Sequence, residues 1–316
     1  MSCRLASVRW VLTVLVLLSG VGVALAEDQI DLSMNLEPGD SFTMELLMEQ
    51  DIDQNMMGRP IGIDQTIGLT MRFDVLDKPA DSGGDWMSCT YTRVRFKQNG
   101  PMGNADFDSE NPPANVPMTA WGFAGLTGQV IEMEFAPGGE VVQIEGVDAM
   151  IANMLDTIDL PEGPQRNAAR DLIRTQVSED MLKQMMGMFA ALSPPGPVAI
   201  GDTWNDTQVI GGMMPMSISN DLKLVGFDGD TATLDVTGTI SPDPDAEPFD
   251  INNMQVEAEL TGTQAGQVVM DRRTGWAKSS KTTQKMEGGM IMLMENGGEL
   301  EVDMTIDSTV TMTMIN

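Results

Sequence analysis

The 316-residue sequence contains no histidine. That absence excludes the Ser-His-Asp type of triad, the usual general base near neutral pH and the commonest protein ligand of zinc. A pair of carboxylates could still hydrolyse a glycosidic bond. With 47 acidic residues in the chain, however, any pair chosen from the sequence would be arbitrary. No nucleophile has a recognisable base beside it in the sequence. We therefore expect a protein that is not an enzyme, with no catalytic residue and no cofactor.

Cysteine is almost as scarce, because the chain holds only Cys3 and Cys89. Residues 1–26 are typical of a signal peptide: Arg4 and Arg9 come first, an apolar run follows, and Ala-Leu-Ala ends the segment. Its removal would leave Cys89 as the single thiol, so no internal disulfide could form. The alternating pattern around Cys89 indicates a small core residue, and a reactive thiol is the alternative. We expect an exported protein, periplasmic or extracellular.

Positive charge is scarce as well. The chain has 18 lysine and arginine residues against 47 aspartate and glutamate residues, which gives a formal net charge of −29. Such a field repels phosphate backbones and anionic lipid surfaces, so we expect no nucleic-acid partner. It suits solubility, cation binding or a basic partner. After residue 26 no apolar run approaches the roughly 18 residues that a spanning helix needs, so we expect no transmembrane segment in the mature chain.

Alternating apolar residues dominate the sequence on both sides of one helical stretch. Between Ile61 and Val75 the apolar residues fall on odd numbers, as in a half-buried strand. Asp228-Gly229 is a typical hairpin turn in the second β region. Between the two regions the spacing becomes helical, with helices beginning at Val147, Pro164 and Ser178. The expected division is an N-terminal β lobe at 27–146, a helical connector at 147–192 and a C-terminal β lobe at 193–316.

Two short turns repeat each other at the start of the two β regions. Gly39-Asp40-Ser41-Phe42 and Gly201-Asp202-Thr203-Trp204 each place a turn pair before a hydroxyl residue and an aromatic residue. A second echo links residues 128–146 to residues 266–288, in the order strand, tight turn, strand and closing glycine. We interpret both as traces of an internal duplication. The predicted fold class is mainly β (α+β): two related, curved antiparallel sheet lobes or half-barrels joined by a helical connector.

Two features of the sequence could bind a metal ion. An acidic loop at 243–250 could hold calcium, but Pro248 and Met254 stand where an EF-hand needs its turn glycine and its bidentate glutamate. A flexible surface loop is the simpler interpretation, and calcium binding there is left open. Methionine thioethers suit copper(I), yet Met290, Met292 and Met294 have the spacing of ordinary core residues on a strand. We expect no metal site.

Methionine is the one abundant residue type that favours a function. The chain has 29 methionines, against five tryptophans, one tyrosine and nine phenylalanines. A flexible thioether suits surfaces that receive varied apolar partners. The third predicted helix is rich in methionine, and its candidate surface for a hydrophobic ligand consists of Met181, Met185, Met188 and Phe189. The alternative is that this helix only fills the sheet.

The two glycine-aspartate turns occur together with the loop Phe107-Asp108-Ser109-Glu110-Asn111-Pro112 and a proline-rich run before Gly201. In these motifs the chain resembles a family of secreted bacterial proteins classed as a domain of unknown function. The resemblance covers most of the mature chain and implies no activity and no site residues. A curved sheet with covering helices is also loosely similar to periplasmic lipoprotein carriers.

The function that we expect is a non-catalytic binding or scaffolding role in the bacterial cell envelope, with an unknown protein partner. The alternative is a periplasmic carrier of a lipid-like hydrophobic ligand. A deep apolar cavity would favour the carrier, and an exposed patch on a solid core would favour a protein partner.

Overall fold

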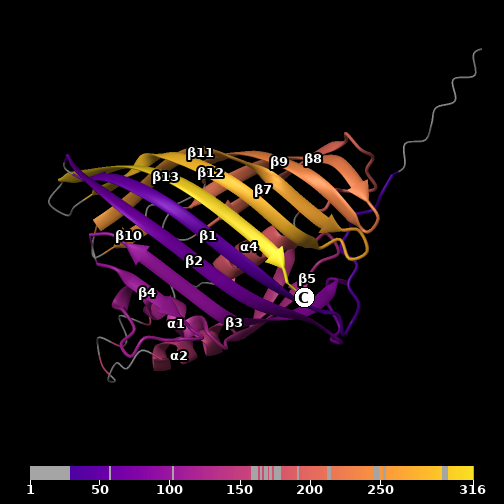
Figure 1. Cartoon of the computed structure of the whole chain (residues 1–316), viewed down its shortest axis with the longest axis horizontal. Coiled ribbons are helices and arrows are strands. Elements are labelled where there is room, and N and C mark those ends of the chain that lie inside the picture. The colour runs from indigo at the N-terminus through magenta and orange to yellow at the C-terminus, as the bar shows by residue number, and fades with distance from the viewer. Residues whose placement is uncertain are drawn as a thin grey trace, which may run out of the picture.

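The alternating sequence folds into long strands, as a computed structural model shows (Figure 1). The structure describes residues 29–56, 58–101, 103–157, 163, 166, 170, 173, 179–190, 192–211, 215–244, 249–251, 254–293 and 298–315. The first half of the chain supplies β1 (Ser41–Met56), β2 (Arg59–Leu76), β3 (Asp85–Asn99), β4 (Ala105–Asp108), β5 (Val130–Phe135) and β6 (Val141–Glu145). The second half supplies β7 (Thr203–Ile210), β8 (Met216–Asp228), β9 (Thr231–Pro242), β10 (Phe249–Ile251), β11 (Met254–Asp271), β12 (Ala277–Leu293) and β13 (Glu299–Met314).

All these strands belong to one antiparallel sheet. Its order is β6-β5-β3-β2-β1-β13-β12-β11-β9-β8-β7, with β4 beside β3 and β10 beside β11. The mainly β prediction is therefore confirmed. The two predicted lobes lie in one continuous sheet, because β1 pairs with β13 from Met44↔Met314 to Met56↔Val302. Long, matched strands make this central pairing possible, since the register has no break along its length.

The described residues include the helical segments η1 (Met118–Ala120), α1 (Trp121–Leu126), α2 (Val147–Thr157) and α4 (Glu179–Ala190). α2 begins at Val147, as predicted, and α4 matches the third predicted helix. The second predicted helix, from Pro164, lies largely outside the described residues. β4 is a correction, because it falls within residues 99–117, whose proline, glycine and asparagine residues predict a loop. It forms because Phe107 pairs with Phe96 of β3 and both side chains are buried.

The two echoed turns have the same geometry. Gly39 N–H donates to the carbonyl of Val75 at 3.0 Å, and Gly201 N–H donates to the carbonyl of Leu224 at 2.7 Å. Both glycines have positive φ angles, 95° and 101°, which a residue with a Cβ rarely adopts. In each turn the aspartate carboxylate accepts a backbone N–H three residues earlier. The turns therefore repeat each other in structure as well as in sequence.

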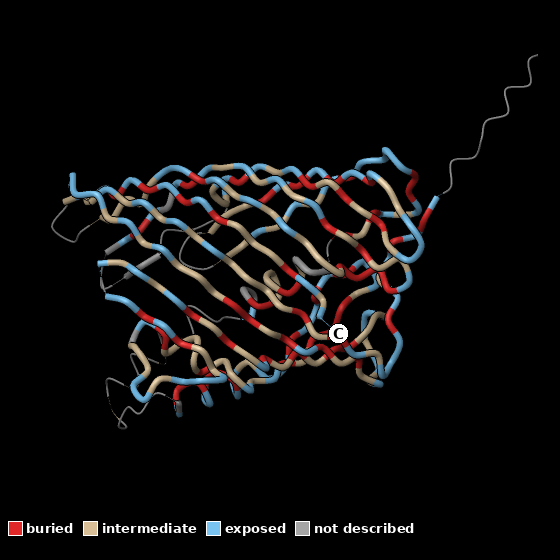
Figure 2. Tube along the Cα trace, viewed as in Figure 1, coloured by how far each residue is buried: buried red, intermediate tan, exposed pale blue. Residues whose placement is uncertain are grey.

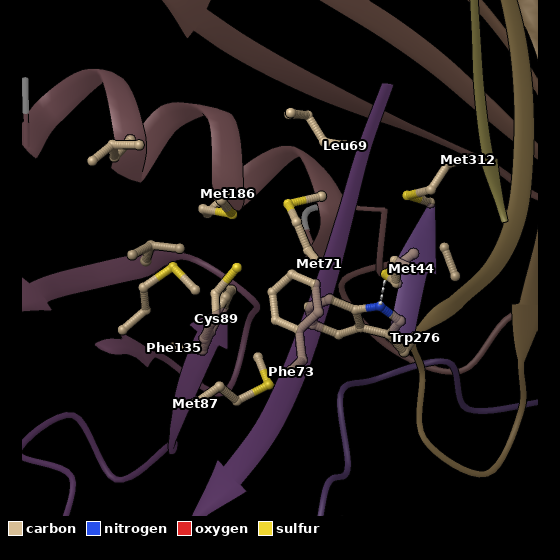
Figure 3. Packing of buried hydrophobic residues seen from close by; sticks show 14 of the residues in the cluster. Met44, Leu69, Met71, Phe73, Met87, Cys89, Phe135, Met186, Trp276 and Met312 are labelled. Carbon is tan, nitrogen blue, oxygen red and sulfur yellow. Dashed lines mark hydrogen bonds between the residues drawn. The ribbon is translucent and has the colours of Figure 1, made fainter. Parts of the chain in front are cut away.

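The main core lies where one face of the sheet meets the helices. Buried positions alternate with exposed ones along the strands, as a period of two requires (Figure 2). Figure 3 shows Trp276 beside Phe73 in this core. The Trp276 ring lies 5.1 Å from that of Phe42, 5.8 Å from that of Phe73 and 5.9 Å from that of Phe135. Cys89 is fully buried in the same cluster, as predicted for a core residue, and burial raises the pKa of its thiol.

The sheet is open at one place, which we call the seam. β6 and β7 are the two ends of the strand order, and among the described residues no bridge joins them. α4 contacts both of these strands. Every neighbouring pair along the path from β6 to β7 is antiparallel, and the path has an odd number of strands. β6 and β7 therefore run in the same direction, so a direct pairing between them would have to be parallel.

Candidate functional site

A groove of about 1080 Å³ lies beside β7 at the seam, and we call it the seam groove. β7 forms one wall, with the residues Trp204 to Val209. α4 and the following Ser193-Pro194-Pro195 stretch form another. The turn before β6 contributes Pro137, Gly138 and Glu140, β6 contributes its first residue Val141, and Ser33 completes the lining. The groove thus gathers segments from both halves of the chain.

α4 presents different sides to the core and to the groove. Leu182 and Met186 are buried in the main core cluster. Lys183, Gln184 and Gly187 line the groove. Lys183 forms an ion pair with Glu179 one turn earlier, with its Nζ 3.0 Å from the carboxylate. The helix is therefore held by its apolar side and leaves a mostly polar side for a ligand.

The backbone of β7 has an open edge that faces this groove. Leu224 N–H of β8 donates to the carbonyl of Asp202 at 3.0 Å, and the register from Thr203↔Lys223 to Ile210↔Met216 is unbroken. In an antiparallel pair the residues bonded to the partner alternate with residues whose N–H and C=O point away. The even-numbered residues of β7 therefore bond to β8, and the odd-numbered ones point to the open edge.

Gln184 gives independent support for this direction. Its Oε1 accepts the backbone N–H of Gly211 at 2.6 Å. Gly211 is the next odd-numbered residue after β7, so an odd-numbered N–H does point toward α4. Gln184 satisfies that group, whereas Asn205, Thr207 and Val209 present theirs to the groove. For these three residues, no hydrogen bond from an edge-facing N–H appears among the described residues.

Two carboxylates give the groove a negative character. Asp206 is half-buried, and its Oδ2 accepts a hydrogen bond from Nε2 of Gln208 at 2.6 Å. Burial raises the pKa of Asp206, because desolvation disfavours its charged form. Glu140, in the turn before β6, is exposed and also lines the groove. Neither carboxylate forms an ion pair within the described part of the chain, and the one lysine of the groove, Lys183, is already paired.

A row of polar side chains crosses the inner face of the sheet and ends at Asp206. The strand registers join nine positions one to the next, which we call the amide row: Asp206, Asn220, Gly238, Gln264, Gln284, Ser308, Gln50, Gln65 and Gln98. All of them carry a polar side chain except Gly238 of β9. Gln284 Nε2 donates to Gln264 Oε1 at 2.9 Å, and Gln264 Nε2 donates to Asn220 Oδ1. A Cβ on Gly238 would lie 2.5 Å from Asn220 Oδ1, so only glycine lets Gln264 reach over β9.

The amide row separates the main core from a second apolar cluster farther along the strands. That second cluster consists of Ile218, Ile240, Leu260, Met286, Met304 and Ile306. Ser308 is 4% exposed, and its Oγ has no hydrogen-bond partner among the described residues. The inner face is thus layered into apolar, polar and apolar bands.

The predicted ligand surface on α4 is described only in part. Met185 is partly buried and packs against the main core. The side chains of Met181, Met188 and Phe189 lie outside the described residues, so the hydrophobic surface stays a prediction. The sequence marked Trp204 only as part of a repeated turn, and it gave no role in a binding site to Trp204, Gln184, Gly187 or Asp206. Gln184, Gly187 and Asp206 line the groove because β7 lies at the end of the sheet. No local sequence pattern predicts that position of β7.

The acidic loop lies partly outside the described residues. Asp245, Glu247 and Pro248 lie outside the described residues, so calcium binding by the loop stays open. Across the part of the chain that the structure describes, no three Cys, Asp or Glu side chains are grouped to hold a metal ion.

Among the described residues, none of the helices has the length and apolar character to cross a bilayer.

Comparison with known proteins gives one family. The sequence model described as "Family of unknown function (DUF6263)" matches residues 86–277, which include β3 from its second residue, β4 to β11, and α4. The chain belongs to this family. The DUF6263 match covers most of the seam groove, including all of β7. It names no ligand, so the groove must be interpreted from its own geometry. No curated protein matches the chain.

Solved structures give only distant likenesses. The outer membrane protein opdK from Pseudomonas aeruginosa is 7% identical, covers 87% of this chain and 98% of its own, and has a TM-score of 0.16. The improved crystal structure of Pseudomonas aeruginosa OccK1 (OpdK) is 9% identical over the same shares, also with a TM-score of 0.16. Likenesses at this level carry no argument about fold or function. The similarity of this DUF6263 chain to lipoprotein carriers is also only weak.

Proposed function

We propose that this protein is an exported, non-catalytic binding protein that holds its ligand in the seam groove. The observation that carries the proposal is the open edge of β7, where backbone donors and acceptors line a groove of about 1080 Å³. Unpaired backbone groups at a sheet edge are a ready template for pairing with another chain. The N-terminal pattern of charge, apolar run and small residues supports export. The lack of histidine supports a role without catalysis.

The framework of the groove suits binding, because its walls are anchored. Trp204 is buried, and its Nε1 donates to the carbonyl of Leu192 at 3.2 Å. Ser193 Oγ donates to the carbonyl of Leu32 at 3.0 Å. The stretch after α4 is thereby tied to both β7 and the N-terminal segment. A ligand in the groove would meet walls whose positions are already fixed, which reduces the entropy lost on binding.

Site-specific photo-crosslinking in the cell of origin tests this proposal. A Cβ at Gly187 would meet nothing within 4 Å, and Gly187 lines the groove. A photoreactive phenylalanine derivative placed there should crosslink a ligand. The matched control is Gly122 of α1, where a Cβ also meets nothing within 4 Å but which does not line the groove. Crosslinks at position 187 and none at position 122 would support the proposal, and equal or absent crosslinking at both would overturn it.

The lipid carrier remains the second candidate, favoured by the methionines of the inner face. Met286 and Met304 belong to the second apolar cluster, and partly buried Met216 and Met290 pack against it. Thioether side chains adapt to acyl chains of varied shape. A photoreactive group at Met290 tests this role. Crosslinked lipid at position 290, with none at position 187, would replace the seam groove with the inner face as the binding site.

A further inference from the structure

We propose that the ligand of the seam groove is an extended, basic polypeptide segment that adds to β7 as an extra antiparallel strand. This inference rests on the proposed function, because it names the class of ligand that the groove takes. Strand addition at an exposed sheet edge is a general mode of peptide recognition: main-chain hydrogen bonds give affinity and side-chain contacts give selectivity. Three properties of the groove point to it: the direction of its backbone groups, the direction of its strands, and its charge.

The backbone groups of β7 are spaced for a strand. Asn205, Thr207 and Val209 alternate along the edge, and each presents an N–H and a C=O to the groove. Val209 is 38% exposed, so it also offers apolar surface to a side chain of the guest. Gln184 bonds to Gly211 and so ends the free edge at that point. A lipid chain or a small polar molecule would leave such a row of alternating donors and acceptors unused.

Strand direction sets the orientation of the guest. β6 and β7 run in the same direction, and the groove lies between β7 and the turn that leads into β6. A guest strand antiparallel to β7 is also antiparallel to β6, so it continues the alternation of the whole sheet. A parallel guest would break that alternation. Antiparallel pairing is also slightly more stable per residue than parallel pairing.

Charge sets the composition of the guest. Asp206 is half-buried at the groove with no cationic partner among the described residues, and the exposed Glu140 also lines the groove. Lysine or arginine side chains of a guest would supply the missing positive charge. The net charge of −29 adds a long-range attraction for basic segments and a repulsion for acidic ones.

Titration with synthetic peptides tests the inference directly. The probe is a peptide of about nine residues with alternating lysine and valine and neutral ends, long enough to span β7 at about 3.3 Å per residue. Two further versions carry N-methyl groups on alternate backbone nitrogens, one on each edge of the peptide. We expect the full-length chain to bind the probe and one methylated version alike. The other methylated version should bind at least about tenfold more weakly, because its pairing edge lacks donors.

Replacement of lysine by glutamate in the probe tests the charge. The glutamate version should bind at least about tenfold more weakly at low salt, and the difference should shrink as salt is added. Equal affinity for the two versions would contradict a basic guest. Equal loss of affinity in both N-methylated versions, or loss in neither, would contradict pairing through one edge.

Thr207→Pro tests the same pairing from the side of the protein. Proline at 207 removes an N–H that faces the groove and breaks no bond to β8, which is where an edge strand tolerates proline. We expect Thr207→Pro to lose peptide binding and the matched Thr207→Val to keep it, with fold checked by circular dichroism. If Thr207→Pro does not fold, the affinities of the two methylated peptides for the unmodified protein still test the pairing.

The outcomes separate this inference from the function on which it rests. Crosslinking at position 187 with no edge-dependent peptide binding would leave a binding groove whose ligand is not a strand. A lipid as the crosslinked species at position 187 would likewise keep the groove and exclude the strand. Absence of crosslinking at position 187 would remove both proposals together.

Discussion

Trp276 is the residue around which the main core packs. It is 1% exposed, lies against three phenylalanine rings and donates its Nε1–H to Met44 Sδ at 3.0 Å. The turn that precedes it needs Gly275, whose φ is 66° and where a Cβ would lie 2.2 Å from the carbonyl oxygen of Ser33. The run Arg273-Thr274-Gly275 between two strand-like segments predicts a turn here. It does not predict the contact of this turn with the N-terminal segment, because that contact joins residues far apart in the chain.

Loss of the Trp276 ring should be costly. Trp276→Ala should lower the free energy of unfolding by about 3–5 kcal/mol, because it leaves a cavity among aromatic rings that cannot collapse into it. Trp276→Phe should cost clearly less, since it keeps a ring in contact with its neighbours. Urea unfolding followed by circular dichroism measures both variants. Equal costs for the two variants would show that the ring packing contributes little.

The raised pKa of Asp206 leads to a prediction about how stability depends on pH. Because burial raises the pKa of Asp206, its carboxylate destabilises the folded state at neutral pH, and this cost fades as pH falls through the raised pKa. Asp206→Asn should therefore stabilise the protein at neutral pH by on the order of 0.5 kcal/mol, since a half-buried charge is still screened by solvent. The gain should vanish below the ordinary aspartate pKa of 3.8.

A second aspartate controls for the overall charge. Asp303→Asn removes one charge from an exposed position on β13, in a chain with a net charge of −29. Thermal unfolding across pH should show a larger gain for Asp206→Asn than for Asp303→Asn at neutral pH. Equal gains would mean that only the overall charge matters.

At the scale of elements, the amide row helps to fix the register of neighbouring strands. A shift of one residue in a strand would move its inward polar residue to the outer face and place a polar or charged outer residue in the apolar bands. Gln264 lies at the best-connected point of this row, because it donates to Asn220 and accepts from Gln284. Removal of its side chain takes a hydrogen-bond donor from the buried Asn220 and an acceptor from the half-buried Gln284.

Gln264→Ala should lower the free energy of unfolding by about 1–3 kcal/mol, the usual cost of leaving buried polar groups without partners. Gln267→Ala is the matched control on the same strand. Gln267 points to the outer face, where its Nε2 donates to Asp235 at 2.8 Å in an exposed position, so its loss should change stability by no more than about 0.5 kcal/mol. Chemical denaturation of both variants measures the difference. Similar values would show that the amide row is only solvated polar surface.

The spacing of apolar residues within single segments predicts most of the strands and helices. Features that depend on which strands pair with each other cannot be predicted from that spacing. The odd-numbered apolar run in Ile61–Val75 predicts β2, and the change of spacing at Val147 predicts α2. β4 escaped prediction because its four residues are too short for a period to show. The amide row escaped it because glutamines at single inward positions look like ordinary breaks in each strand. They form a row only when the registers bring them together.

At the scale of the whole molecule, the seam gives the protein its candidate site. Sequence could predict many strands and a helical stretch between them, but not that β1 and β13 pair at the middle of the sheet. That pairing pushes β6 and β7 to the two ends and leaves α4 between them. Pairing order is set by contacts between distant segments, so the seam and its groove could be found only in the structure.

Hydrogen exchange at β7 tests the central claim most directly. In the free protein the backbone amides of Asn205, Thr207 and Val209 should exchange faster than those of the three even-numbered residues from Trp204 to Gln208. The alternating lysine–valine peptide should slow exchange at the odd-numbered amides and leave the even-numbered ones unchanged. Uniform exchange along β7, or odd-numbered amides that the saturating peptide does not protect, would contradict an open edge that binds a strand.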